Sequence, residues 1–145
     1  MFAWLPAAFC FLALGQLPVL AGDLKFEVQL LWGTNDPQPP DSKHKEVAPD
    51  VKKKLKELPL KWSNYFEVNR IRFDVPPSGT KRVAISEKCE IEVKDLGHSK
   101  IEVTHFGKGQ CVYDGTHSLP KGDIFVLGGN APNSTTWLLV LKRVD

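Results

Sequence analysis

Three histidines and one cysteine fall within a 20-residue stretch in the second half of the chain. Two histidines, one cysteine and a weak axial methionine are the ligands of blue-copper centres on β-sandwiches. Here five residues separate the cysteine from the histidine that follows it, and the only methionine is Met1. We therefore expect no metal and no cofactor, with a copper-like or hydrolytic use of residues 98–117 as an alternative. The residues concerned are His98, His105, Cys111 and His117.

Cys89 and Cys111 are the two cysteines beyond the first 21 residues, and an even number in an exported protein favours a disulfide. The intervening turn residues, however, predict a three-stranded meander with Cys89 opposite about Phe106 and Cys111 opposite about His105. The cysteines are then two strand spacings of about 4.8 Å each apart, beyond the limit of about 7 Å between Cα atoms. A Cys89–Cys111 bond requires the chain to leave the meander near residues 107–109; two free buried thiols are the alternative.

No residue pattern typical of a catalytic site is present. None of the serines lies in a Gly-x-Ser-x-Gly elbow, which presents an activated nucleophile. The acidic residues between positions 90 and 102 alternate with apolar ones, as on the solvent-exposed face of a hairpin, and lysines nearby can pair with them across the strands. We therefore predict that the protein is not an enzyme.

Residues 43–61 carry seven lysines against three acidic residues. Binding to an anionic surface or polysaccharide is the functional interpretation, whereas a solvated helix face is the interpretation favoured by the narrow apolar stripe. Three aromatic residues flank this segment, and exposed aromatics suit sugar or peptide binding. The weak candidate ligand surface consists of Trp32, Trp62, Tyr65, Lys52, Lys53 and Lys56.

Residues 1–21 carry no charged side chain and contain an apolar run over residues 7–14. Gln16 and Pro18 interrupt the run, and residues 19–21, which end in Ala21, have small or medium-sized side chains, as at a cleavage site. This pattern predicts a signal peptide cleaved after Ala21, and hence a secreted or periplasmic protein. An uncleaved anchor is the alternative, because no Lys or Arg precedes the run, although a spanning helix needs about 20 apolar residues.

The remaining chain, residues 22–145, is expected to form a single domain without a membrane span. Its net charge of +2 is close to neutral. A nucleic-acid-binding domain is typically strongly basic, so we expect no nucleic-acid partner. A chain of this length buries about two thirds of its unfolded surface, which is enough to fold without a metal or a disulfide framework.

The elements that must position these residues are mostly strands. Residues 24–30 alternate apolar and polar side chains, which predicts a half-buried strand. Residues 49–58 place Val51, Leu55 and Leu58 on one helical face, and Pro59 ends that helix. From Tyr65 onward, short apolar runs separated by turn residues predict antiparallel strands. They cover residues 66–75, 81–86, 89–95, 100–106, 110–113, 123–127 and 135–143, with a turn at 128–130.

The expected fold is all-β and mainly antiparallel: a β-sandwich or partly open barrel of about eight strands with one short helix near the N-terminus. The continuously apolar residues 137–141 are expected to be covered on both faces. Together these features predict an exported, non-enzymatic binding or structural module of the cell envelope or extracellular space. Its partner would be an unidentified protein or polysaccharide.

Overall fold

The computed structural model describes residues 22–36, 44–131 and 135–145. The predicted signal peptide and most of the proline-rich loop before the helix lie outside these residues. Within them, the elements in chain order are β1 (Leu24–Thr34), β2 (Lys45–Glu46), α1 (Pro49–Glu57), β3 (Asn64–Val75), β4 (Thr80–Ser86), β5 (Cys89–Gly97), β6 (Lys100–Gly107), β7 (Gln110–Ser118), β8 (Ile124–Ala131) and β9 (Thr135–Arg143).

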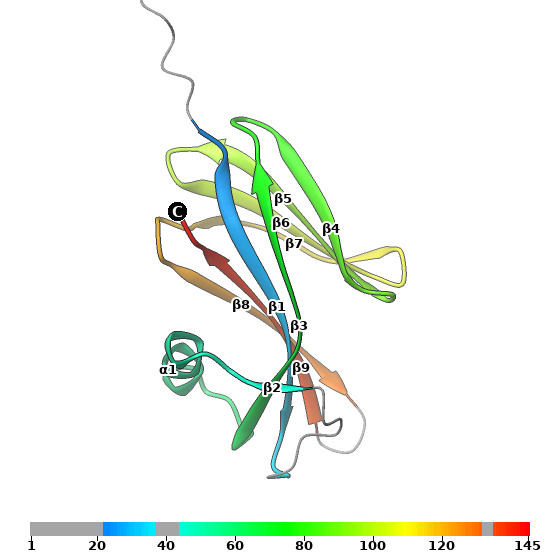
Figure 1. Ribbon diagram of the computed structural model, residues 1–145. Helices are drawn as coiled ribbons and strands as arrows, with labels where there is room; N and C mark the ends of the chain where they lie inside the picture. Colours follow the sequence, from blue (N-terminus) through cyan, green and yellow to red (C-terminus); the bar gives the residue numbers. More distant parts are fainter. Residues whose placement is uncertain (1–21, 37–43, 132–134) are drawn as a thin grey trace, which may run out of the picture.

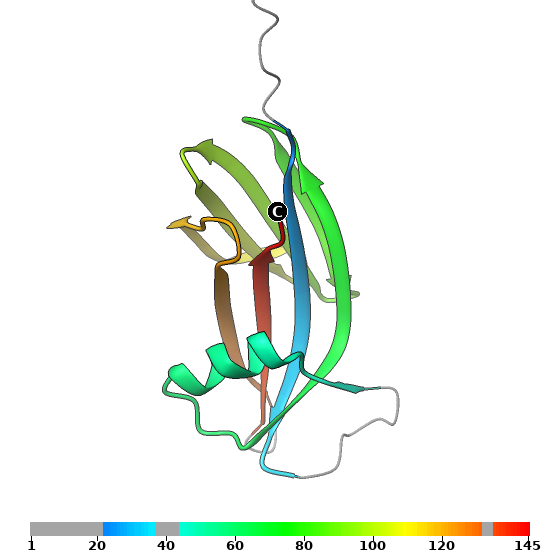
Figure 2. The ribbon, with the colours of Figure 1, turned by 60° about the vertical axis from the view of Figure 1, so that its left-hand side comes forward.

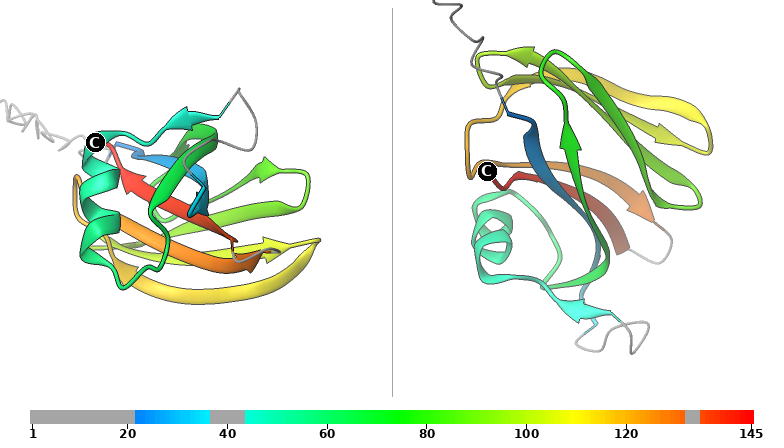
Figure 3. Two further views of the ribbon diagram at one scale, coloured as in Figure 1. Left: turned by 90° about the horizontal axis from the view of Figure 1, so that it is seen from below. Right: turned by 45° about the horizontal axis from the view of Figure 1, so that its top comes forward.

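The strands form two antiparallel sheets, which confirms the predicted β-sandwich with one short helix. One sheet has five strands in the order β2-β3-β1-β9-β8, and the other has four in the order β4-β5-β6-β7. The chain crosses from the first sheet to the second at residues 76–79 and returns at residues 119–123. The sheets lie close together at one end of the sandwich and splay apart at the other (Figures 1 and 3).

The main core lies between the sheets and is built from alternate residues of both. Phe26 of β1 stacks on Phe73 of β3 with ring centroids 5.7 Å apart, and both belong to one buried cluster with Ile91 and Val103 of the opposing sheet. Period-two alternation places such side chains on one face of each strand. β9 lies between β1 and β8 and is buried on both faces, as predicted for residues 137–141.

The helix α1 covers the outer face of the five-stranded sheet (Figure 2). Pro49 occupies the first turn, where its missing N–H is not needed. Asp50 forms an ion pair with Lys142 of β9. Val51 and Leu55, one turn apart, are buried against Leu138 and other apolar residues of the sheet. The predicted apolar stripe is thus confirmed, and the helix ends one residue earlier than predicted.

Register shifts interrupt four of the strand pairings, and two of these shifts leave an exposed valine as the extra residue. In β3, Val68 has no partner, because Leu30 pairs with Asn69 and Leu31 with Glu67. In β7, Val112 is the extra residue, because Phe106 of β6 pairs with Cys111 and the next pair skips one position. A bulge bends its strand and re-aims the side chain of the extra residue.

Most strands are longer than predicted, and β7 and β8 extend well beyond their predicted ends. β8 continues through Gly128 and Gly129, which were expected to form a turn. A Cβ atom on Gly129 would fall on the indole ring of Trp137, so this glycine permits close approach of a neighbouring side chain rather than a turn. β7 continues to Ser118, beyond its predicted end at residue 113, which places His117 in the strand.

The expected Cys89–Cys111 disulfide is not formed, and both residues are free thiols. β5, β6 and β7 form the plain meander, in which Cys89 pairs with Gly107 and Cys111 with Phe106. Each pairing differs by one residue from the predicted one. The two cysteines lie on opposite sides of β6, and two strand spacings are too wide for a disulfide.

Candidate binding cleft

A cleft of about 600 Å³ lies between the two sheets and is lined almost wholly by apolar atoms. Leu30 and Trp137 come from the five-stranded sheet, and Cys89 and His105 come from the four-stranded sheet. Ligand pockets in proteins have volumes of about 300–1,000 Å³ and are mainly apolar with a few polar groups. The remaining lining residues are Leu31, Trp32, His44, Val68, Ser86, Lys88, Gly107, Lys108 and Val112.

Both bulged valines line this cleft. Val68 is 38% exposed and lies in the five-stranded sheet, and Val112 is 59% exposed and lies in the four-stranded sheet. An exposed valine does not contribute the free energy that burial of its apolar surface would provide. The two bulges therefore present apolar side chains to the cleft, and bulges occur preferentially at sheet edges and beside functional sites.

Inside the cleft, the Cys89 Sγ lies 3.2 Å from the His105 Nε2. Burial raises the pKa of the Cys89 thiol to about 11, and the charge of Glu90 contributes in the same direction. Burial also lowers the pKa of His105, which is only 4% exposed. Both groups are therefore neutral near pH 7, and the pair lacks the thiolate that a nucleophilic cysteine requires.

The His105 ring also contacts the Trp137 ring edge-on, with centroids 5.1 Å apart. Trp137 in turn covers Gly129 of β8, where a side chain would collide with the indole. Packing on both sides thus holds the indole in place, and it forms part of the cleft wall. A rigid aromatic wall suits an apolar ligand because little side-chain entropy is lost on binding.

Two lysines lie where the turns of the four-stranded sheet reach the cleft. Lys88 belongs to the β4–β5 turn and Lys108 to the β6–β7 turn, and the Lys108 N–H donates to the Lys88 carbonyl at 2.9 Å. Both side chains are exposed and line the cleft. In the described ranges, neither ammonium group forms an ion pair. Glu87, also exposed, is the one acidic residue of the β4–β5 turn.

The three aromatic residues of the predicted ligand surface do not form one surface. Trp32 lines the cleft, whereas Trp62 lines a different cavity. Tyr65 packs against the core beneath α1, and burial raises the pKa of its hydroxyl. The three aromatic residues are close to the helix in the sequence, but they lie in different places in the fold.

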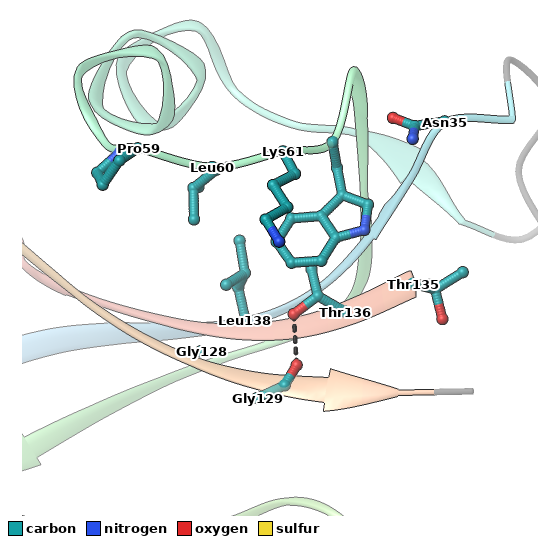
Figure 4. A pocket seen from close by; sticks show the side chains of 10 residues that line it. Asn35, Pro59, Leu60, Lys61, Gly128, Gly129, Thr135, Thr136 and Leu138 are labelled. Atoms are coloured by element: carbon teal, nitrogen blue, oxygen red, sulfur yellow. Dashed lines mark hydrogen bonds between the residues drawn. The ribbon is translucent and has the colours of Figure 1, made fainter. Parts of the chain in front are cut away.

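The cavity lined by Trp62 has a volume of about 630 Å³ and a mixed polar and apolar lining (Figure 4). The Thr136 hydroxyl hydrogen-bonds to the Gly129 carbonyl. The Asn35 Oδ1 accepts hydrogen bonds from Ser63. Several polar groups of this cavity are thus already satisfied by the protein itself.

The predicted lysine surface lies on α1. Lys52, Lys53 and Lys56 are all exposed, whereas Val51 and Leu55 of the same helix are buried against the sheet. None of them lines the cleft between the sheets. The lysine-rich helix and the cleft are therefore separate features.

The histidines and cysteine of residues 98–117 do not gather at one site. His98 lies in the β5–β6 turn with a φ of 53°, and Cys111 is exposed on β7. The His117 Nε2 lies 2.6 Å from the Tyr113 hydroxyl, and its ring packs on Phe125. Among the residues that the structure describes, no three His, Cys, Asp or Glu side chains are placed to hold a metal ion.

Comparison with known proteins gave no match: no family model fits the chain, and no curated protein or solved structure is significantly similar. No helix in the described part of the chain is long and apolar enough to cross a membrane.

Sequence reasoning missed the bulged valines, Trp137 and the two cleft lysines. One signal for the first bulge was present in the sequence. In β3 the apolar side chains occupy even positions at Phe66 and Val68 and odd positions from Ile71 onward. A change of phase within a period-two pattern marks an extra residue in the strand. No comparable signal identifies Lys88 or Lys108 among the chain's many lysines.

Proposed function

We propose that this protein is an exported, non-enzymatic binding module that takes an apolar ligand into the cleft between its two sheets. The observation that carries the proposal is the pair of exposed valines, Val68 and Val112, which β-bulges direct toward one cleft. Export rests on the apolar, uncharged residues 1–21. A binding role, as opposed to a catalytic one, is supported by the almost wholly apolar lining of the cleft, in which burial raises the pKa of the Cys89 thiol and keeps it neutral.

The cleft supports this function better than the other features do. Its lining offers apolar surface whose transfer from water stabilises a complex by about 25 cal/mol per Å². In the cavity beside Trp62, the side chains of Asn35 and Thr136 already form hydrogen bonds within the protein. These two polar groups are therefore not free to bind a saccharide. The lysines of α1 line neither of these two cavities. Binding of an anionic surface by the lysines of α1 is the second candidate function.

Binding of Nile red, an uncharged apolar dye, tests the proposal. We expect saturable one-site binding to residues 22–145, weakened about tenfold in the double variant V68N/V112N, because each substitution removes apolar contact area from the cleft. The double variant L96N/V144N is the matched control. Leu96 and Val144 are the other two large exposed apolar residues of the described chain, 41% and 36% exposed, and neither lines the cleft.

Binding is measured by the fluorescence of the dye, and thermal melts verify that each variant is folded. Absence of saturable binding to the wild-type protein would contradict the proposed function. An equal loss of affinity in L96N/V144N would contradict it as well, because the dye would then be responding to exposed apolar surface in general and not to the cleft.

A further inference from the structure

The rim of the cleft combines apolar and cationic groups. Val68 and Val112 are exposed and apolar, while Lys88 and Lys108 are exposed and charged, and all four line the same cleft. Trp137, Leu30 and the neutral Cys89–His105 pair line the same cleft with them. Both lysines that line the cleft thus lie in turns, and the other ionisable side chains of the lining are His44, Cys89 and His105.

We propose that the ligand is a single-chain anionic amphiphile, whose apolar chain occupies the cleft and whose carboxylate lies between Lys88 and Lys108. This inference rests on the proposed function. A wholly apolar ligand would leave the lysines unused, and a cationic one would be repelled by them. An ammonium group attracts a carboxylate at the surface with modest energy that falls with added salt.

The backbone holds the two lysines in one place. The hydrogen bond from the Lys108 N–H to the Lys88 carbonyl, 2.9 Å long, joins the two turns that carry them. Lys108 itself has a φ of 51°, so its backbone is in the left-handed region and the following Gly109 has a φ of 78°. Two consecutive residues with positive φ form a tight turn, which keeps Lys108 beside the opening.

The cleft fits a monomeric amphiphile better than a membrane surface. Its volume of about 600 Å³ lies between two sheets, and its apolar lining includes Trp137 together with His105. A membrane surface would instead require a flat apolar face. The expected ligand is therefore a free carboxylate with one apolar chain.

Displacement of Nile red by three twelve-carbon compounds tests this inference: dodecanoate, dodecanol and dodecyltrimethylammonium. At low salt and pH 8 we expect dodecanoate to bind about tenfold more tightly than dodecanol, and the cationic compound to bind most weakly. The double variant K88Q/K108Q should bind dodecanoate and dodecanol equally. The control K81Q/K94Q removes the same charge from two exposed lysines outside the cleft and should keep the preference.

Equal affinity of the wild-type protein for dodecanoate and dodecanol would overturn the inference and leave the apolar cleft standing. Failure of every compound to displace bound dye would overturn the inference, whereas absence of saturable dye binding would overturn the proposed function as well. A preference that disappears in K52Q/K53Q but not in K88Q/K108Q would also overturn it and assign the anion to α1. Sedimentation with anionic phospholipid vesicles without binding of monomeric dodecanoate would overturn it in favour of a membrane surface.

Discussion

At the scale of single residues, the two thiols differ in their surroundings. Cys89 is half-buried beside His105, and the pKa of its thiol is raised to about 11. Cys111 is exposed on the edge strand β7. Only the thiolate reacts with alkylating agents, so a raised pKa and burial both slow the reaction.

We therefore predict that iodoacetamide at pH 8 modifies Cys111 much faster than Cys89 in the folded protein, with both modified after unfolding. Mass spectrometry of peptides measures the two rates, and the variant C111A should lose the fast phase alone. A Cys89–Cys111 disulfide in non-reduced protein would contradict the pairing of β5, β6 and β7. Comparable rates for the two thiols would contradict the buried position of Cys89.

At the scale of secondary-structure elements, β1 and β3 are joined by a charged network as well as by their backbones. Glu27 of β1 is 4% exposed and accepts a hydrogen bond from the Arg72 Nε at 2.8 Å and one from Gln29 at 2.8 Å. Arg70 lies 3.5 Å from the same carboxylate. Glu27 and Arg72 are directly opposite in the register of the two strands, where opposite charges stabilise a sheet.

Burial alone would raise the pKa of Glu27, but hydrogen bonds from Arg72 and Gln29 and the charges of both arginines lower it below its ordinary value of 4.5. A carboxyl group with a lowered pKa in the folded state stabilises the protein above its unfolded pKa. That stabilisation is lost as the pH falls through the folded-state pKa, which here lies below 4.5.

Substitution of Glu27 by Gln is therefore expected to lower the free energy of unfolding by about 1 kcal/mol at pH 7, a modest value because both arginines are partly exposed. The difference from wild type should shrink at pH 3, where the wild-type carboxylate is being protonated. Urea denaturation at the two pH values measures this. E90Q, which breaks the exposed Arg82–Glu90 pair, is the control and should change stability less. A pH-independent effect of E27Q would contradict the argument.

At the scale of the whole molecule, the N-terminal segment predicts where the protein resides. The apolar, uncharged residues 1–21 predict export and cleavage after Ala21. We expect the exported protein to begin at Gly22, as read by N-terminal sequencing. Because signal peptidase requires a small residue before the cleaved bond, the variant A21R should remain uncleaved. Recovery of wild-type protein with Met1 on membranes would instead establish an anchor.

The fold class was predictable from the sequence by itself because it depends on local periodicity. Alternation in residues 24–30, the four-residue spacing of Val51 and Leu55, and the turn residues between short apolar runs each report on which face of an element is buried. The errors, Gly128 and Gly129 among them, arose where a glycine served packing and not a turn. Local pattern does not distinguish these two uses.

Only the tertiary structure decided the candidate site. The cleft brings together Val68, Lys88, His105 and Trp137, which lie on four different parts of the chain. Their proximity depends on strand order and on how far the two sheets separate, and no local pattern encodes either quantity. The same reason explains the cysteines: Cys89 meets His105 instead of Cys111, because β6 lies between the strands that carry the two thiols.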